Sequence, residues 1–423
     1  MGLLQPHGRR ARTDGQRALS TPVRTLDDLE VEGRRVLVRL DLNVPLNGDV
    51  VSDDTRIVAS LPTLRELRRR DATLVLMSHL GRPRGEAEER FRLRPVAKRL
   101  SELLGTDVRY LATPGPASAE QQRFVAEGPP GSVTLLENTR FDSRETANDP
   151  ALARTLAGYA DLHVNDAFGA AHRAHASTRA VAELLPSAAG LLMMTELEAL
   201  SRLTDGPTRP FKVVLGGAKV SDKLAVIEAL LERLLKEGDA LLIGGAMAYT
   251  FIKAGVGEVE AGEVGDSLVE DDMLSVARKV ALRADERGIK LLLPRDSVCA
   301  KALEEGVATE IHPSNAIPAG LMGLDIGPAA ITEFVAELQD AATVFWNGPL
   351  GVFEIPAFAA GTMSVAKAIA GLDAYTVVGG GDSLAAVNRA GVGQQIDHLS
   401  TGGGASLEFL EGQELPGVSI LRR

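Results

Sequence analysis

The sequence predicts an α/β protein built from two doubly wound, Rossmann-like parallel sheets. Short apolar runs bounded by Gly, Pro, Asp or Asn alternate with helical segments along the chain, as expected when helices cover both faces of a parallel sheet. The chain has 423 residues and is therefore longer than a typical single domain with one hydrophobic core. The apolar runs also fall into two groups. We therefore expect two domains joined by a hinge helix.

Nine apolar runs are the clearest strand candidates. They lie at residues 36–40, 73–77, 133–136, 162–164, 212–215, 240–243, 290–293, 343–346 and 375–378. Segment 223–236 shows apolar residues at helical spacing, with Ser221 and Asp222 as expected caps and Gly238 as the expected stop. The repeated order of strand, helix and strand is typical of a parallel sheet.

The domain boundaries follow from these groups. We expect the first domain at 23–188, the hinge helix at 189–206 and the second domain at 207–399. Residues 1–22 are rich in arginine and lack apolar periodicity, so we interpret them as a flexible extension. A transit peptide is one alternative for this segment, and an internal start near Val23 is another.

The composition argues against several classes of protein. A net charge of −11 disfavours a broad surface for nucleic acid. Cys299 is the single cysteine, so an intramolecular disulfide or a cysteine-rich zinc site is excluded. The chain has neither a run of 18 apolar residues nor the apolar core of a secretory signal. We expect a cytoplasmic protein with small-molecule partners and no nucleic-acid or membrane partner.

Chemically distinctive residues follow directly after the predicted strands, where open α/β sheets bind ligands. The first half carries candidate cations at Arg56, His79, Arg82, Arg140, His172, Arg173 and His175. Arginine forks match carboxylate and phosphate oxygens, so this group suits a small, multiply anionic substrate. The second half carries glycine-rich turns before helices, together with Lys219, Lys223, Glu354 and Asp382. Bare backbone N–H groups and helix starts suit the phosphates of a nucleotide.

Each of these residues also has a purely structural interpretation. A single arginine after a strand is usually solvated, a Gly-Gly pair is usually a tight turn, and Asp382 can simply cap a helix. His163 is interpreted as structural, and nothing favours a role for His7 or His398. The coincidence at successive strand ends favours a site. Neither a P-loop nor a dinucleotide fingerprint occurs, which disfavours an unrelated Rossmann-type oxidoreductase.

Nine ordered motifs resemble those of the phosphoglycerate kinases. They are VLVRLDLNVPL from Val36, SHLGRP from Ser78, LENTRF from Leu136, NDAFGAAHRAHAS from Asn165, GGAKVSDK from Gly216, GGAMAYTF from Gly244, WNGPLGVFE from Trp346, GGGDSLAA from Gly379 and STGGGASLEFLEG from Ser400. The resemblance runs from about residue 24 to the C-terminus. It implies reversible transfer of the acyl phosphate of 1,3-bisphosphoglycerate to MgADP, giving 3-phosphoglycerate and MgATP.

The resemblance also implies which residues form the site. The 3-phosphoglycerate site is expected at Asp41, Asn43, Arg56, His79, Leu80, Gly81, Arg82, Arg140 and Arg173. The site for ATP or ADP is expected at Lys219, Lys223, Gly323, Glu354, Gly380, Gly381, Asp382 and Ser383. Arg56, Lys219 and Gly380 are the expected catalytic residues, and Asp382 is expected to hold Mg²⁺ on the nucleotide.

Further expectations rest on the same resemblance. Residues 400–423 are expected to return to the first domain, hinge closure is expected to bring the substrates in line, and the protein is expected to be a monomer. A catalytically silent scaffold of the same fold is the alternative. Such a scaffold would typically lack a charged site residue, and none of those named is missing.

Overall fold

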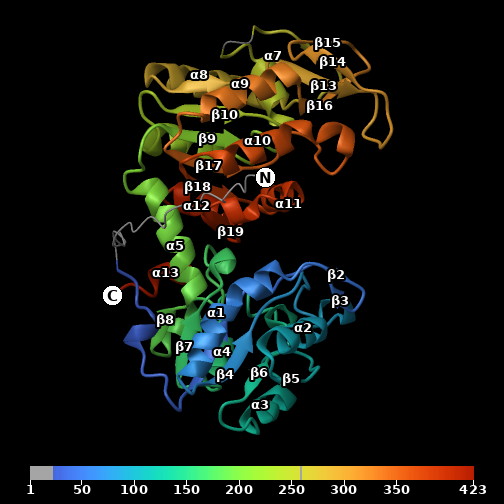
Figure 1. The fold of residues 1–423 in the computed structure, drawn as a ribbon. Helices are drawn as coiled ribbons and strands as arrows, with labels where there is room; N and C mark the ends of the chain where they lie inside the picture. Colours follow the sequence, from blue (N-terminus) through green and yellow to red (C-terminus); the bar gives the residue numbers. More distant parts are fainter. Residues whose placement is uncertain (1–21, 258–259) are drawn as a thin grey trace, which may run out of the picture.

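The computed structural model describes residues 22–257 and 260–423. Except for Pro22, the expected N-terminal extension lies outside these residues. The chain forms two lobes joined by the long helix α5 (Leu191–Thr204), with one lobe above and one below it in Figure 1. Each lobe contains a six-stranded parallel sheet. The predicted α/β class with two Rossmann-like sheets is therefore confirmed.

The first lobe has the strand order β5-β6-β4-β1-β7-β8. Its sheet strands are β1 (Arg35–Arg39), β4 (Thr73–Met77), β5 (Val108–Tyr110), β6 (Val133–Leu135), β7 (Leu162–Asn165) and β8 (Ser187–Ala189). A short hairpin, β2 (Leu46–Asn47) and β3 (Val50–Val51), follows β1. The helices are α1 (Thr55–Arg69), α2 (Arg94–Leu104), α3 (Ala119–Ala126) and α4 (Pro150–Ala157), with 3-10 turns at Leu26–Asp28, Glu89–Phe91, Thr139–Phe141, Phe168–Ala170 and Ala180–Glu183.

Alternate residues of the first sheet pack on opposite faces. Val36 and Val38 belong to the apolar cluster that contains the buried side chains of α1 and α2. Leu37 belongs instead to the cluster of the other face, with Leu152 and Leu156 of α4. Because successive side chains of a strand point in opposite directions, a strand with two covered faces must be apolar throughout.

The second lobe has the strand order β12-β10-β9-β17-β18-β19. Its sheet strands are β9 (Phe211–Leu215), β10 (Ala240–Ile243), β12 (Lys290–Leu292), β17 (Thr343–Asn347), β18 (Tyr375–Gly379) and β19 (His398–Ser400). The helices are α6 (Leu224–Ala229), α7 (Met247–Lys253), α8 (Leu274–Glu286), α9 (Pro328–Leu338), α10 (Ala360–Gly371) and α11 (Gly381–Ala390), with 3-10 turns at Asp271–Met273, Pro356–Phe358 and Gly393–Gln395. Buried residues of α7 and α8 pack in one apolar cluster, and those of α9, α10 and α11 in another.

A smaller antiparallel sheet extends the second lobe and was not predicted. It consists of β14 (Glu310–Pro313), β13 (Asp296–Ala300) and β16 (Met322–Ile326), and β11 (Glu263–Val264) pairs with β15 (Ala316–Ile317) beside it. β13 and β16 bury alternate residues, and β14 is largely exposed. These segments therefore lack the continuous apolar runs by which the parallel strands were recognised.

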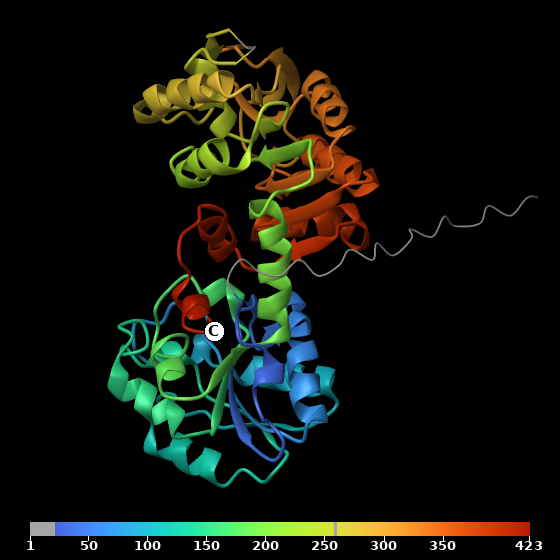
Figure 2. The ribbon, with the colours of Figure 1, turned by 90° about the vertical axis from the view of Figure 1, so that its left-hand side faces the viewer.

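The two lobes share packing through α5 and the C-terminal segment. One apolar cluster contains side chains from α5, from the second lobe and from the last residues of the chain. α12 (Gly404–Leu410) and α13 (Pro416–Ser419) lead the segment down beside α5 to the first lobe (Figure 2). There Arg24 N donates to Leu421 O at 2.9 Å, and Asn165 Nδ2 donates to Gly417 O at 3.0 Å.

The helix predicted at 223–236 differs in detail. It is α-helical over Leu224–Ala229 and continues as a π-helix over Leu230–Leu234. The expected caps are wrong, because the helix begins without a side-chain cap and the Ser221 hydroxyl donates to Glu270 Oε1 at 2.5 Å instead.

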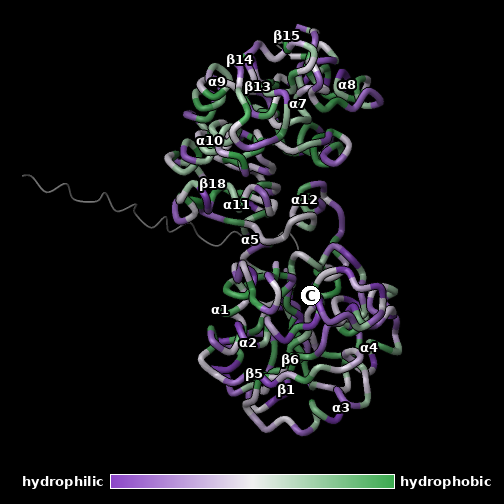
Figure 3. Tube along the Cα trace, turned by 90° about the vertical axis from the view of Figure 1, so that its right-hand side faces the viewer, coloured by the Kyte–Doolittle hydropathy of each residue, from purple (hydrophilic) through white to green (hydrophobic). Residues whose placement is uncertain are grey.

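Figure 3 shows hydrophilic and hydrophobic residues alternating along the chain in both lobes. No helix among residues 22–257 and 260–423 has the length and apolar character needed to cross a membrane.

Candidate active site

The carboxyl ends of the central strands of the first sheet open onto a cavity of about 820 Å³. β1 has β4 on one side and β7 on the other, so the chain order reverses there, and ligands bind at such switch points. The segments after β1, β4 and β7 line the cavity, together with the first turn of α1. Residues 402–404 of the C-terminal segment line it as well.

Most of the expected 3-phosphoglycerate residues meet at this cavity. Those that line it are Asp41, Asn43, Arg56, His79, Gly81, Arg82, Arg140 and Arg173. Leu80 is the exception, because its side chain is buried in the apolar cluster behind the cavity. Both backbone groups of Leu80 are also taken by Asn138, whose Nδ2 donates to Leu80 O at 2.8 Å.

Polar contacts fix the positions of several lining residues. Arg56 Nη1 donates to Asp41 Oδ2 at 2.7 Å, which holds the guanidinium at the cavity. Gly81 N donates to Asn43 Oδ1 at 2.8 Å, and Gly81 O accepts from Arg140 Nη1 at 2.7 Å. Gly81 has φ +63°, and a Cβ there would lie 2.3 Å from the ring of Phe91. Glycine is therefore required at the centre of this arrangement.

The charge of the cavity comes from arginine. His79, His172 and His175 were expected among the cations, but burial and the neighbouring guanidinium groups disfavour their charged forms. Burial, followed by the field of Arg39, lowers the pKa of His79 well below its ordinary value and that of His175 to about 4. Burial and the neighbouring Arg173 also lower the pKa of His172. These shifts favour the neutral form of all three imidazoles, and the guanidinium groups provide the attraction for an anion.

The second site lies at the carboxyl ends of β9, β17 and β18. The loop after β17 is at its centre: Gly217 N donates to Pro349 O at 3.1 Å, and Gly245 N donates to Leu350 O at 3.1 Å. A Cβ at Gly216 would lie 2.0 Å from Pro349 O. The loops therefore approach backbone to backbone, which only glycine allows, and this leaves the edge free of side chains.

Several of the expected nucleotide residues lie at the start of α11. Lys219 and Asp382 are exposed, and Lys223 Nζ contacts Asn347 Oδ1. Burial lowers the pKa of Lys223, and Asp382 opposes that change, so the two charges are neighbours. Gly381 begins the ten-residue helix, Gly380 precedes it with φ +94°, and the Ser383 hydroxyl accepts from Gly348 N at 2.7 Å.

Gly323 and Glu354 lie further along the same edge. Gly323 is in β16, and a Cβ there would meet the hydroxyl oxygen of Tyr249 at 1.8 Å. The next residue of β16, Leu324, accepts a hydrogen bond at 2.9 Å from Val352 N, in the loop that leads to Glu354. Glu354 is exposed. The loop after β17 thus connects all parts of the expected nucleotide site.

The carboxylate of Asp382 fits a metal that arrives with a nucleotide. No group of three or more His, Cys, Asp or Glu side chains within residues 22–257 and 260–423 is arranged to hold a metal ion. Asp382 offers one exposed carboxylate at the start of α11. One or two carboxylates with substrate phosphates are what Mg²⁺ uses in kinase sites.

In Figure 1, α11 and β19 lie at the side of the second lobe that is nearest to the first lobe. A second, smaller cavity of about 130 Å³ is lined by Arg56 of the first lobe and by Gly381 and Leu384 of α11. Arg56 lines both this space and the larger cavity. It therefore lies on the path between an anion in the first lobe and the start of α11.

Comparison with known proteins identifies the family. The family model "Phosphoglycerate kinase" matches residues 26–413. The chain belongs to the phosphoglycerate kinase family. A phosphoglycerate kinase of Rubrobacter xylanophilus is 55% identical over 400 residues, which cover 94% of this chain and 98% of the relative. One of Thermus thermophilus is 54% identical and is covered completely, over 94% of this chain. The resemblance found in the sequence, and with it the phosphotransferase class, is confirmed.

Solved structures give the same result for the fold. The phosphoglycerate kinase of Coxiella burnetii matches with a TM-score of 0.82 at 38% identity, over 95% of this chain and 99% of that one. The enzyme of Pyrococcus horikoshii matches with a TM-score of 0.80 at 32% identity, over 94% and 98% of the two chains.

Sequence reasoning missed several residues that build the site. Arg39 and Glu145 are buried behind the cavity, and Asn347 links Lys223 to the carbonyl oxygen of Gly379. His398, for which no role was predicted, lies with its Nε2 2.8 Å from Glu196 Oε2 on α5. Burial of these charged or polar side chains depends on elements distant in sequence. The position of Asn347 directly after the predicted strand at 343–346 was the one available signal.

Proposed function

We propose that this chain transfers the acyl phosphate of 1,3-bisphosphoglycerate to ADP, and catalyses the reverse reaction, with the glycerate in the first lobe and the nucleotide in the second. The observation that carries the proposal is the position of Arg56. It lines the arginine-rich cavity and also the small space in front of α11. An anion held in the first lobe would thus face the helix start that suits a nucleotide's phosphates.

Arginine side chains would hold the glycerate substrate in the first lobe. Arg82, Arg140 and Arg173 line the cavity, and their forked donors suit phosphate and carboxylate oxygens. Arg56, held by Asp41 at 2.7 Å, would approach the transferring group.

Backbone groups and lysines would hold the nucleotide in the second lobe. The glycine loops after β9 and β17 leave room for phosphates. The backbone N–H groups at the start of α11, together with the positive end of the helix dipole, would attract those phosphates. Lys219 is exposed in the loop after β9, so it would be able to contact a phosphoryl group of a nucleotide held there. Magnesium bound with the nucleotide would be held by Asp382 and would neutralise phosphate oxygens.

The chemistry requires no general base on the protein. In either direction the attacking oxygen, a phosphate or a carboxylate, is already ionised. Positioning and neutralisation of charge on the transferring group therefore supply most of the rate. Arg56, Lys219 and the helix start at Gly380 are the groups placed to supply them, once α5 allows the lobes to close.

The finer assignments belong to the same proposal. We propose domains at 23–188 and 207–399, with 189–206 as the hinge and 400–423 tying the second domain back to the first. We also propose a cytoplasmic monomer that requires Mg²⁺ and binds neither nucleic acid nor a membrane.

Binding calorimetry on variants of two exposed cationic residues, one in each lobe, tests whether each lobe binds one substrate. Arg173→Gln should weaken binding of 3-phosphoglycerate by roughly tenfold or more while leaving MgADP binding unchanged. Lys219→Gln should do the reverse. Both side chains are exposed, so neither change should disturb folding. If each variant weakened both ligands equally, the assignment of one substrate to each lobe would be wrong.

A further inference from the structure

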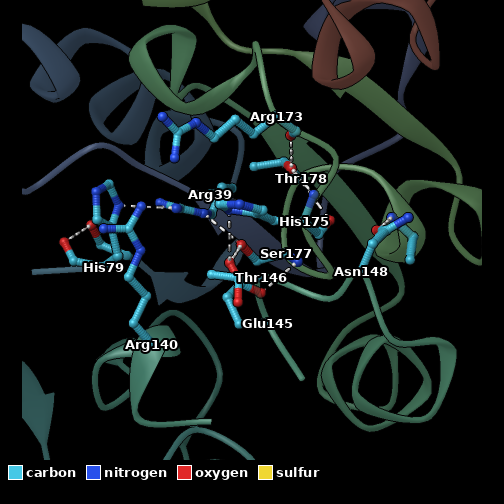
Figure 4. A network of polar contacts seen from close by, with 12 residues as sticks. Arg39, His79, Arg140, Glu145, Thr146, Asn148, Arg173, His175, Ser177 and Thr178 are labelled. Carbon is cyan, nitrogen blue, oxygen red and sulfur yellow. Dashed lines mark hydrogen bonds and ion pairs between the residues drawn. The ribbon is translucent and has the colours of Figure 1, made fainter. Parts of the chain in front are cut away.

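A buried arginine, Arg39, lies directly behind His79 of the substrate cavity (Figure 4). Its side chain is 1% exposed, so it does not belong to the surface that meets the substrate. Arg39 Nη2 lies 3.2 Å from His79 Nδ1. Arg39 Nη1 contacts the carbonyl oxygen of Leu40, and Arg39 Nε donates to Ser177 Oγ at 2.7 Å.

The directions of these hydrogen bonds are determined by chemistry. A guanidinium has only donors, so His79 Nδ1 must accept the hydrogen bond from Arg39. On the other side, Ser177 donates its single hydroxyl hydrogen to Glu145 Oε1 at 2.5 Å, which leaves its oxygen lone pairs for Arg39 Nε–H. Glu145 is itself fixed, because Ser177 N donates to its other oxygen at 3.0 Å.

We propose that Arg39 is a positioning residue that fixes His79 in its Nε2–H tautomer, so that this histidine meets the substrate as a neutral hydrogen-bond donor rather than as a cation. The hydrogen-bond chain runs from Arg39 in both directions. It reaches the carboxylate of Glu145 through Ser177 on one side and the imidazole on the other. With Nδ1 accepting, the neutral ring carries its single proton on Nε2.

The surroundings of His79 oppose a second proton on the ring. The groups that act on it are Arg39 of β1, Arg56 of α1, Arg140 of the turn after β6, and His175. All of them lower its pKa, in addition to the effect of burial. A neutral N–H still bonds to a phosphate, carboxylate or hydroxyl oxygen, and it does so without adding charge to a cavity that already holds several guanidinium groups.

The role of the donor depends on the proposed function, because the oxygen that would accept from Nε2 belongs to 3-phosphoglycerate. The tautomer itself does not depend on it. A spectroscopic measurement on the protein without ligand therefore separates the two proposals.

Nitrogen NMR of the full chain with ¹⁵N-labelled histidine is the first test. The chain has 7 histidines, and the signals lost in His79→Gln assign His79. We expect an unprotonated Nδ1 and a protonated Nε2 for His79, unchanged between pH 8 and pH 5, whereas an exposed histidine titrates near pH 6.5. In the double variant Arg39→Met, Glu145→Gln, which removes both buried charges together, His79 should show mixed tautomers. Signals of an Nδ1–H tautomer or of an imidazolium at pH 7 in the unaltered protein would overturn the proposal.

Two amide variants test the position of the donor. A glutamine amide reaches about as far as Nε2, and an asparagine amide reaches only about as far as Nδ1. His79→Gln should therefore give a KM for 3-phosphoglycerate roughly tenfold below that of His79→Asn, because only the glutamine amide keeps a hydrogen bond to the charged substrate. Equal KM values for the two variants would contradict a donor at Nε2.

Discussion

Replacing Glu196 with leucine should destabilise the connection between the lobes by about 4 kcal/mol. Glu196 on α5 is fully buried. Its Oε1 accepts from Thr401 N at 2.7 Å and from Thr401 Oγ1 at 2.9 Å, and its Oε2 accepts from His398 Nε2 at 2.8 Å and from Ser400 Oγ at 2.7 Å. Leucine fills a similar volume but accepts no hydrogen bond.

The size of this loss of stability depends on which hydrogen-bond donors to Glu196 can find another acceptor. The hydroxyls of Ser400 and Thr401 can rotate toward other acceptors, but the Thr401 amide and the His398 ring cannot. Each buried donor left without an acceptor costs about 1–3 kcal/mol, so two of them cost about 4 kcal/mol. Glu196→Gln is the matched control. Its carbonyl oxygen can serve Thr401, and its amide can donate to Ser400 and to His398 in the other tautomer, so we expect a loss of about 1 kcal/mol.

Guanidinium unfolding followed by circular dichroism gives the stabilities, and steady-state kinetics gives the effect on activity. Thr401 leads into residues 402–404, which line the substrate cavity, so Glu196→Leu should also raise the KM for 3-phosphoglycerate. A loss of stability below about 1 kcal/mol for leucine, or equal losses for leucine and glutamine, would refute this reasoning.

Two further predictions concern buried residues, one in each lobe. Burial raises the pKa of Asp166 to about 7, from an ordinary value near 3.8. Between these two values the native carboxyl keeps a proton that the unfolded chain releases. The resulting contribution to the free energy of unfolding is present below pH 4 and is lost as the pH rises to 7. In urea unfolding, the stability of Asp166→Asn relative to the unaltered protein should therefore rise by about 2–3 kcal/mol between pH 5 and pH 8, and a constant difference would contradict the pKa shift. Gly216→Ala should weaken MgADP binding in calorimetry by roughly tenfold or more, because the added Cβ would lie 2.0 Å from Pro349 O. The control Gly371→Ala, whose Cβ would have no atom within 4 Å, should leave binding unchanged. Equal affinities for the two variants would contradict the close approach of the loops.

The sequence predicted nine of the twelve strands in the two parallel sheets, because their signal is local, and it missed the three-residue strands β5, β8 and β19. Strands buried on both faces are continuous apolar runs, and the predicted run at 240–243 matches β10 in full. The antiparallel β13 has alternating burial and polar residues, so it carried no such signal. The π-helix at Leu230–Leu234 was also invisible, because apolar spacing does not distinguish it from an α-helix.

The site could be predicted in part for a similar reason. Residues that follow a strand within a few positions, such as His79 and Lys219, can be assigned to a sheet edge from local pattern alone. The charge state of His79 could not be predicted, because it depends on Arg39 and on burial by distant segments. The contribution of residues 402–404 to the cavity depends on the path of the C-terminal segment, which no local pattern shows.

The central claim is that opposing charges from two lobes catalyse phosphoryl transfer. The most direct test is the turnover of purified protein with 3-phosphoglycerate and MgATP, coupled to glyceraldehyde-3-phosphate dehydrogenase and read as loss of NADH. We expect turnover by the unaltered chain, and a fall in kcat of roughly 10²–10³ or more for Lys219→Ala, as for other charge clamps on a transferring phosphoryl group. Folded protein that binds MgADP but gives no turnover would contradict the account and indicate a silent scaffold of this fold.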